Sequence, residues 1–498
     1  MIRKYIIFIT IIFFFTAYPI PGEEIPVDKD MLEKILQQQD ALEKEIRSLK
    51  DRLKKLKDKK TVPAEKSEDM ELLKADVEEI SDLLDTVETR SILDKIQISG
   101  EFHTRMNFYN YDDMEMEDGQ KKDGRTDELW SGRLRLNLRS EITDNLIFQG
   151  RLTYYKLWGD TNYEGLTGST DFYHPGTPDQ EGDLHVERAY IDYFIPGTPF
   201  SVTLGRMPTG NGPPYGLKNN TTRKATWPML CHDGELDGIM TNLLIDKRTG
   251  LKNAFFRLGY YKFSQNYQQY QGVEKDPTRV AIAAFETMVP GIRDSIFWVS
   301  YDRAFDMGAF DHPAAASYPS DSGYMDKLNL HIQFNNIKNS GFSCFASYAY
   351  ERIRPRPEGT IFPPEVTGMP FDYEVGLLGD NLTDSLGKPR NGRAWYMGMN
   401  YRLPFKTLKY PRLGFEYNHG SEHWISAPVS GGDEFLNKLT VNGDAYELYY
   451  IQPINEKHMF CRIGAVWLDY DSVMNFFGPS TETDMSVMNS YFLINVRF

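Results

Sequence analysis

The sequence predicts an all-β transmembrane barrel of about sixteen antiparallel strands, preceded by a short α-helical coiled coil. From residue 96 onward, apolar and polar residues alternate along many short segments. The connections between these segments alternate between short and long, and the last segment alternates up to a terminal Phe. We therefore expect a signal peptide at 1–22, a periplasmic coiled-coil segment at 23–94 and an outer-membrane barrel at 95–498.

The composition excludes several other classes of protein. Charged residues make up 26% of the chain, and no apolar run beyond the N-terminal segment is long enough for a membrane-spanning helix. Barrel strands alternate apolar with polar residues, so such a composition is compatible with a barrel. The net charge of −15 argues against nucleic-acid binding, which needs a basic face. The 30 Tyr and 30 Phe residues are typical of the aromatic girdles of a membrane barrel.

The N-terminal segment has the layout of a secretory signal. Arg3 and Lys4 precede the apolar run Ile6–Phe15, and polarity then rises toward Gly22. No cysteine follows the apolar run, so lipoprotein processing is not indicated. An uncleaved N-terminal anchor is the alternative, and in both cases the remaining chain is exported.

A heptad pattern follows the signal and covers residues 31–57. The a positions hold Leu32, Gln39, Ile46 and Leu53, and the d positions hold Ile35, Leu42, Leu49 and Leu56. Pro63 interrupts the pattern, which resumes at Met70. Because a lone helix would expose this apolar seam to water, we expect a partner helix and favour a homo-oligomer, with a trimer as the preferred state. A helix that folds back and a disordered charged linker are the alternatives.

Strand-type alternation begins at residue 96 and is clearest at 327–335. There Leu328, Leu330, Ile332 and Phe334 alternate with Asn329, His331, Gln333 and Asn335. The candidate strands are 96–108, 130–142, 146–158, 184–194, 200–207, 236–245, 253–262, 279–287, 294–303, 327–335, 341–351, 393–402, 411–419, 444–452, 458–468 and 488–498. A count of fourteen or eighteen is the alternative, since several segments alternate less clearly.

The lengths of the connections distinguish a barrel from a soluble two-sheet sandwich, which also alternates along its strands. Short connections such as Thr143–Asn145 and Ile195–Pro199 take turns with long ones rich in Gly, Asp, Asn and Pro. Outer-membrane barrels have short periplasmic turns and long outer loops, whereas a sandwich has no reason for this regularity.

The last strand carries an assembly signature. Its outward positions are Phe492, Ile494, Val496 and Phe498. This pattern resembles the C-terminal signature of outer-membrane proteins that the barrel-assembly machinery recognises. It predicts that machinery and outer-membrane lipid as partners. An ordinary edge strand is the alternative.

Two segments carry a family resemblance. VERAYIDYF (186–194) and VTLGRMPTGNG (202–212) look like segments of a family of bacterial porin-like proteins, known mainly as a domain of unknown function, and of the phosphate and carbohydrate porins. The resemblance spans most of residues 90–498 and rests on strand-and-turn patterns. It implies a passive or substrate-biased channel.

The expected lumen is basic on one side. A barrel of about sixteen strands leaves an aqueous channel. Inward positions of its early strands are Arg105, Arg133, Arg135, Arg139 and Arg151, together with Glu101 and Glu141. We interpret the arginines as a basic wall that favours anionic or zwitterionic solutes. The alternative is that they pair with inward acids such as these two glutamates and give no selectivity.

The long connection Pro208–Glu235 is the candidate constriction loop. Its position resembles that at which general porins fold a loop into the pore. It carries Lys218, Arg223, Lys224, Asp233 and Glu235. Together with the basic wall, these residues are predicted to set a transverse electric field across the pore.

Neither catalysis nor a cofactor is predicted. Cys231, His232 and Asp233 are metal-capable neighbours, but without a second cluster they indicate no metal site. The sequence has no nucleophile elbow, zincin or phosphate-loop motif. We expect a channel for passive diffusion of small hydrophilic solutes. The alternatives are a structural or adhesion anchor, and a barrel conduit that houses a partner protein.

Overall fold

The computed structural model describes residues 96–115, 121–158, 184–221, 223, 225–232, 235–262, 278–307, 323–364, 369–380, 386–425, 437–455, 458–473 and 480–498. The predicted signal peptide and coiled coil lie outside the described residues, as do Lys224 and Asp233 of the predicted constriction loop.

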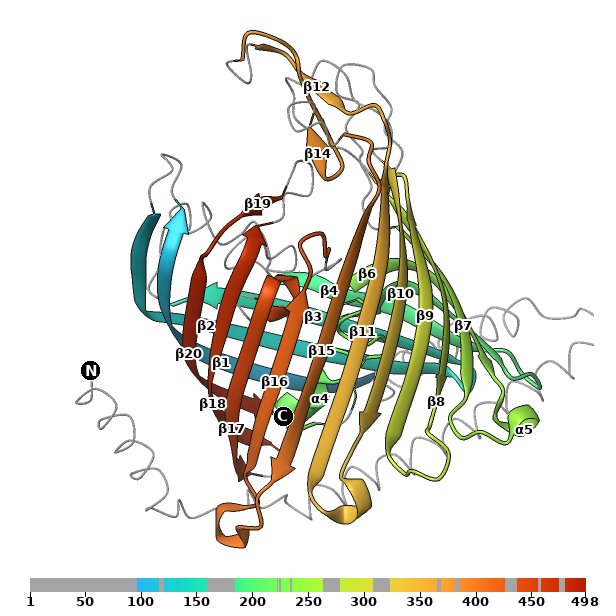
Figure 1. Ribbon diagram of the computed structural model, residues 1–498. Helices are drawn as coiled ribbons and strands as arrows, with labels where there is room; N and C mark the ends of the chain where they lie inside the picture. Colours follow the sequence, from blue (N-terminus) through green and yellow to red (C-terminus); the bar gives the residue numbers. More distant parts are fainter. Residues whose placement is uncertain are drawn as a thin grey trace, which may run out of the picture. The chain divides into compact units, whose positions relative to one another are not determined.

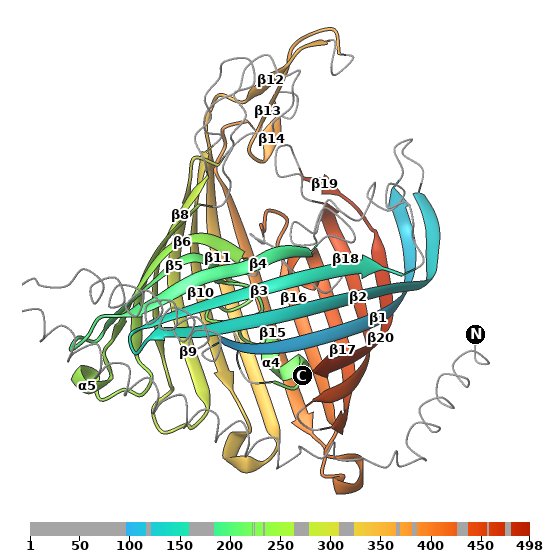
Figure 2. The same cartoon turned by 180° about the vertical axis from the view of Figure 1, so that it is seen from behind.

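Within the described residues, sixteen long strands form one closed antiparallel barrel (Figures 1 and 2). They are β1 (Ile96–Glu115), β2 (Lys121–Thr143), β3 (Leu146–Leu157), β4 (Leu184–Phe194), β5 (Phe200–Pro208), β6 (Glu235–Leu244), β7 (Phe255–Lys262), β8 (Arg279–Thr287), β9 (Ser295–Phe305), β10 (Gly323–Phe334), β11 (Phe342–Pro355), β15 (Arg390–Arg402), β16 (Arg412–Gly420), β17 (Asn442–Asn455), β18 (Met459–Val473) and β20 (Ser486–Arg497). Each pairs with its neighbours along the chain, so the barrel class predicted from the sequence is confirmed.

The barrel closes between its first and last strands. β1 pairs with β20 from Glu101↔Arg497 to Asp112↔Ser486. The seam continues beyond Glu101, where the Gly100 amide donates to the Phe498 carbonyl at 2.6 Å and the Phe498 amide donates to the Gly100 carbonyl at 3.0 Å. Closure therefore leaves the barrel without an edge strand, and its backbone groups are paired around the ring.

The short and long connections lie at opposite ends of the barrel. The short turns hold the one-turn elements α5 (Asp246–Thr249), η4 (Ile337–Asn339) and η5 (Lys406–Leu408). At the other end, β12 (Thr360–Phe362), β13 (Tyr373–Gly376) and β14 (Gly379–Asp380) form a small separate sheet, and β19 (Thr481–Glu482) pairs with β18 (Figure 1). We call these the short-turn end and the long-connection end. No helix among the described residues is both long and apolar enough to cross a membrane.

The sequence prediction differs from the structure at the first hairpin. All sixteen candidate segments are strands, but β1 and β2 extend past them, so the predicted long connection at 109–129 is mostly strand. In this extension both faces carry exposed polar residues, as at Asp112, Asp113 and Lys121. Without a buried face there is no apolar alternation to signal a strand. Glu235 likewise begins β6 rather than ending the loop.

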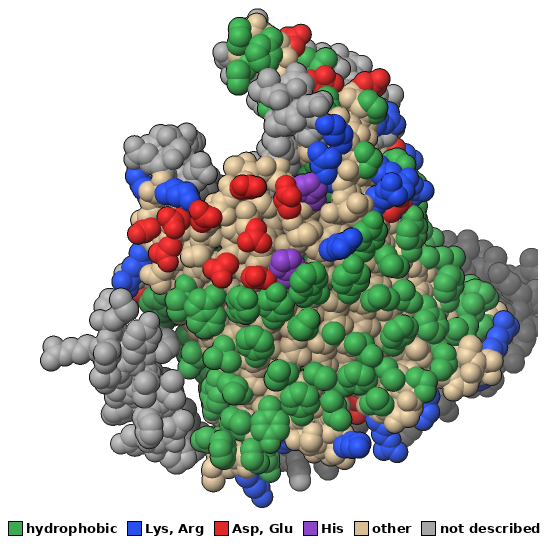
Figure 3. All heavy atoms as spheres, in the orientation of Figure 1, with side chains coloured by type: hydrophobic (Ala, Val, Ile, Leu, Met, Phe, Trp, Pro, Cys, Tyr) green, Lys and Arg blue, Asp and Glu red, His purple; other side chains and the backbone are tan. Residues whose placement is uncertain are grey.

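The outer surface of the barrel is an apolar band. On β10, Leu328 and Leu330 point outward with 40% and 39% of their surface exposed, whereas Asn329 and His331 point inward and are buried. Figure 3 shows hydrophobic side chains covering a broad band of this face, with acidic and basic side chains above and below it. A soluble monomer rarely exposes so large an apolar surface, so the band indicates an apolar surrounding.

Candidate functional site

The connection between β5 and β6 folds into the barrel. We call residues 209–234 the constriction loop; they include the one-turn helix α4 (Tyr215–Lys218). Its buried residues include Thr209, Asn211, Leu217, Lys218, Asn219, Ala225, Trp227, Leu230, Cys231 and His232. A surface loop would expose most of these side chains, so the loop fills space inside the barrel.

Gly212 lets the two arms of the constriction loop cross. A Cβ atom at this position would lie 1.6 Å from the Trp227 carbonyl oxygen, which is far inside contact distance. Nearby, the Met229 amide donates to the Pro213 carbonyl at 2.9 Å. The GNGPP stretch at 210–214 therefore supplies the close backbone approach that the loop needs to turn back on itself.

We expect Gly212→Ala to destabilise the folded protein by about 1–3 kcal/mol, because the added methyl group must displace the Trp227 arm. Urea unfolding of the refolded protein measures this loss, and near-ultraviolet circular dichroism reports the displacement of Trp227. Gly124→Ala is the matched control, since its Cβ would meet Tyr111 at an ordinary 3.8 Å. Equal stability of the two variants would contradict the tight crossing.

Ion pairs and hydrogen bonds fasten the constriction loop to opposite walls. On one side, the Lys218 ammonium lies 2.9 Å from the Glu447 carboxylate on β17. On the other, the Arg223 guanidinium forms a bidentate pair with Glu286 on β8. Arg188 on β4 also donates to the Gly210 carbonyl at 3.3 Å. Because β4, β8 and β17 lie on different sides of the ring, the loop crosses the lumen.

A second segment enters the lumen from between β16 and β17. Its described parts are 421–425 and 437–441, which include η6 (Lys438–Thr440). The side chains of Trp424 and Leu439 are fully buried. The Lys438 ammonium forms ion pairs with both Glu416 and Glu447. This segment therefore meets the constriction loop at Glu447, which binds a lysine from each.

Little space remains where the loop meets the walls. One cavity of about 20 Å³ separates the constriction loop from β1–β4, and another of about 10 Å³ separates it from η6. Such volumes hold about one water molecule. Among the described residues, a wider space of about 350 Å³ opens beside Gln149, Asp192 and Trp227, toward the short-turn end. Within the part of the chain that the structure describes, the space beside the constriction loop is therefore far smaller than the space toward the short-turn end.

Four of the five arginines predicted to line the pore point inward, and most of the five are in ion pairs. Arg105, Arg133, Arg135 and Arg151 are buried and point inward, whereas Arg139 is exposed at the short-turn end. The pairs are Arg133–Glu101 at 3.0 Å, Arg135–Glu187 at 2.7 Å, Arg151–Glu187 at 3.0 Å and Arg139–Glu141 at 2.9 Å. Arg105 instead donates to Asn107 at 2.7 Å and stacks over Tyr491 at 4.1 Å.

A β-bulge adds two charged residues that the sequence pattern did not reveal. The register between β3 and β4 shifts after Arg151↔Arg188, so that Leu152 pairs with Val186 and Glu187 is the extra residue. Both Glu187 and Arg188 are consequently buried on the inner face. Strict alternation would have sent one of them outward, which is why Glu187 was not among the predicted inward acids.

The constriction keeps a charge asymmetry. The cavity of about 20 Å³ is lined by Arg135, Arg151 and Arg188 and by one acid, Glu101. Glu235, predicted as a loop residue, pairs with Arg188 at 2.8 Å. The opposite wall presents Glu351, Glu416 and Glu447, and these are matched by Lys327, Lys438 and Lys218. The excess positive charge therefore lies on the β1–β4 side.

Three of the four predicted assembly residues lie on the outer face of β20, and the fourth, Phe498, follows the strand. Phe492, Ile494 and Val496 are half-buried and alternate with inward residues, while Phe498 keeps 63% of its surface exposed. Their side chains point away from the lumen, so they do not line the constriction.

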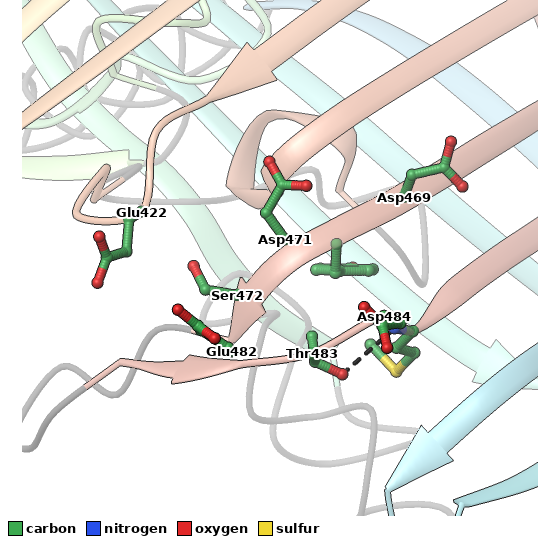
Figure 4. A pocket seen from close by; sticks show the side chains of 9 residues that line it. Glu422, Asp469, Asp471, Ser472, Glu482, Thr483 and Asp484 are labelled. Carbon is green, nitrogen blue, oxygen red and sulfur yellow. Dashed lines mark hydrogen bonds between the residues drawn. The ribbon is translucent and has the colours of Figure 1, made fainter.

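An acidic pocket lies at the long-connection end. The pocket has a volume of about 500 Å³. Figure 4 shows its carboxylates on β18, β19 and the segments beside them. The acids are Glu422, Asp469, Asp471, Glu482 and Asp484. Lys121 pairs with Asp484 at 2.9 Å, and this hydrogen bond lowers the pKa of the Asp484 carboxyl below its usual range. This end of the barrel thus presents negative charge, in contrast to the constriction.

Comparisons with known proteins give a family and distant structural likenesses. A family profile described as "Protein of unknown function (DUF3373)" matches residues 123–494. A search of curated proteins found no match. Among solved structures, the chain is similar to Salmonella typhi OmpF in complex with daunomycin, with 11% identity, a TM-score of 0.42 and coverage of 81% of this chain and 97% of that one.

Two further solved structures are similar to this chain to about the same degree. The chain is similar to Pseudomonas putida OprB at high pH, with 13% identity, a TM-score of 0.45 and coverage of 82% of this chain and 96% of that one. It is also similar to an anion-selective porin from Comamonas acidovorans, with 10% identity, a TM-score of 0.43 and coverage of 81% and 99%. No residue role carries over from these proteins.

Proposed function

We propose that this chain, which belongs to the family described as "Protein of unknown function (DUF3373)", is an outer-membrane channel for small hydrophilic solutes, narrowed by its constriction loop and biased toward anions. The observation that carries the proposal is the loop itself. It crosses a sixteen-stranded lumen and is fastened to opposite charged walls. A barrel of this width would otherwise leave an open aqueous passage, so the loop is placed to decide what passes.

The outer surface supports a membrane location. Exposed apolar side chains occur around the ring, as at Phe102 on β1, Leu258 on β7 and Leu448 on β17, and the barrel has no edge strand. Within lipid, every backbone group must be paired inside the protein. β10 and β20 have 12 residues each, enough for a tilted strand to span the hydrocarbon region. Short turns would then face the periplasm and long connections the outside, as in bacterial outer-membrane barrels.

The charge at the constriction supports the anion bias. The acidic pocket at the long-connection end is open to solvent, where salt screens charges within about 8 Å at physiological ionic strength. The arginines at the constriction lie in a buried, narrow space, where screening is weak. The positive charges at the constriction should therefore affect ion preference more than the negative charges of the acidic pocket do.

A structural or adhesion anchor is the second candidate. The small size of the cavities beside the constriction loop favours it, since about 20 Å³ admits no hydrated ion without movement of the loop. A conduit for a folded partner protein fits less well. Two segments of the chain itself occupy the described lumen, and a partner would have to displace both.

Single-channel recording of the purified, refolded full-length protein in a planar bilayer tests the proposal. We expect small, stepwise openings and, in a salt gradient, a reversal potential of the sign given by anion preference. Openings in groups of three would support the trimer predicted from the heptads. Silence from a heat-modifiable, folded barrel would contradict the channel and favour the anchor.

The triple variant Arg135→Gln, Arg151→Gln and Arg188→Gln should reverse the ion preference. These are the three basic residues that line the constriction cavity. Their loss leaves Glu101 in the lining and takes the arginine partners from Glu187 and Glu235 beside it. We expect the reversal potential to change sign. Arg139→Gln is the matched control, because that arginine is exposed outside the constriction and its removal should leave the potential unchanged. An unchanged potential in a folded triple variant would disprove the basic constriction.

A further inference from the structure

The last residues of the constriction loop meet an acid on the barrel wall. Cys231 and His232 lie at the end of the loop, and Asp302 points inward from β9. Only 1%, 5% and 3% of their respective surfaces are exposed. One donor atom from each residue lies within 4.8 Å of the other two. Three different ligand types thus converge inside the barrel, from residues about seventy positions apart.

Two of the three distances between the donor atoms fit one metal ion. The Cys231 sulfur lies 3.4 Å from Oδ2 of Asp302, and Nε2 of His232 lies 3.5 Å from the same oxygen. Zinc binds sulfur at about 2.3 Å and nitrogen or oxygen at about 2.0–2.2 Å in a tetrahedral arrangement, which separates such ligands by roughly 3.4–3.6 Å. The third pair, the Cys231 sulfur and a His232 ring nitrogen, lies within 4.8 Å, so these two side chains must move toward each other by on the order of 1 Å to bind one ion.

His232 supplies an independent indication. Among the described residues, neither of its ring nitrogens has a hydrogen-bond partner, although both are buried. The other carboxylate oxygen of Asp302, Oδ1, also has none there. Buried polar atoms normally find partners, because an unpaired group costs about 1–3 kcal/mol. A bound cation would satisfy the Nε2 of His232 and the carboxylate together.

The surroundings complete the site. The Asn329 amide donates to Asp302 at 2.5 Å and to the Ser300 hydroxyl at 3.2 Å, so it holds the acid in place. Trp227 packs edge-on against His232, with ring centroids 6.2 Å apart. Outer contacts of this kind orient metal ligands and exclude water from the site. The fourth coordination position is left to a water molecule or to the Asn329 side chain.

We propose that Cys231, His232 and Asp302 bind one divalent transition-metal ion, for which Zn²⁺ fits the mixed sulfur, nitrogen and oxygen ligands best. The bound ion would join the constriction loop to the β9 wall. This site is independent of whether the barrel conducts ions. A hard ion such as Mg²⁺ would not use the thiolate.

Metal content of the full-length refolded protein tests the proposal. After equilibration with Zn²⁺ and washing, we expect about one zinc per chain. Co²⁺ in place of zinc should give the visible and near-ultraviolet absorption of a thiolate-bound tetrahedral ion. It should also quench the fluorescence of neighbouring Trp227. Cys231→Ala and Asp302→Asn should each weaken binding by more than about 100-fold, since even outer contacts contribute 10–100-fold.

The chain offers a matched control for the cysteine variant. Cys344 and Cys461 lie at outward positions of β11 and β18, so the double variant Cys344→Ala, Cys461→Ala should bind the metal as the wild type does. Heat-modifiable migration verifies that each variant is folded. Less than stoichiometric zinc in the wild type would overturn the proposal. Zinc retained by a folded Cys231→Ala variant would also overturn it. A Co²⁺ spectrum of the wild type without a thiolate band would do the same, and this measurement does not depend on the folding of any variant.

Discussion

Replacing residues 210–233 by a short glycine-rich turn will raise the single-channel conductance on the order of tenfold, as expected when a sixteen-stranded lumen loses its obstruction. The strands themselves permit this change, because Pro208 and Glu235 are paired partners at the ends of β5 and β6. A short turn can therefore close this hairpin without altering the register of the barrel. Current traces at equal salt concentration, before and after the replacement, measure the effect.

A double variant tests the ion pairs of the constriction loop separately from the loop itself. Lys218→Ala with Arg223→Ala keeps the constriction loop but removes its ion pairs to opposite walls. We expect intermediate conductance and noisier openings, because the loop is then held only by packing around Trp227 and by hydrogen bonds such as those from Arg188 and Arg497 to its backbone. Unchanged conductance in the folded loop-replacement protein would show that the loop does not limit the current.

Lys438→Met should lower the free energy of unfolding by about 3–5 kcal/mol, which is the usual consequence of removing one partner from a buried ion pair. The Lys438 ammonium is 3% exposed and neutralises Glu416 and Glu447, whose side chains are also buried. Without it, only Lys218 and the nearby Arg462 remain to balance these two carboxylates. Equilibrium urea unfolding in lipid or detergent measures the loss.

Two controls test the electrostatic origin of that loss. Adding Glu416→Gln to the Lys438→Met protein should recover part of the stability, because it removes one of the unpaired charges. Arg139→Gln breaks an exposed pair, with about half of each side chain in solvent, and should change stability by less than about 1 kcal/mol. A loss in Lys438→Met no larger than in Arg139→Gln would contradict the account.

The barrel was predictable from the sequence because its outer face meets one uniform apolar surrounding. Alternation along β10, from Leu328 to Phe334, records which side chains face outward. The pattern failed where no such face exists, in the extension of β1 and β2. The two regions preceding the barrel, 1–22 and 23–94, remain predictions because they lie outside the described residues.

The site was only partly predictable, because its partners come from distant strands. The sequence identified the inward arginines and the loop that carries Lys218 and Arg223. It could not indicate that Glu187 turns inward, since a bulge breaks the alternation there. Nor could it pair Lys218 with Glu447, which is 229 residues away, or bring Asp302 beside Cys231. Such pairings depend on how the loop folds into the closed ring.

The seam between β1 and β20 also couples barrel closure to the constriction loop. Glu101 and Arg497 face each other across it although 396 residues separate them, so the seam has the largest chain-closure cost of the barrel. Arg497 donates from the seam to the carbonyl groups of Asn219 and Asn220 in the interior. The last strand therefore both closes the ring and holds the loop, so damage to this strand should weaken both.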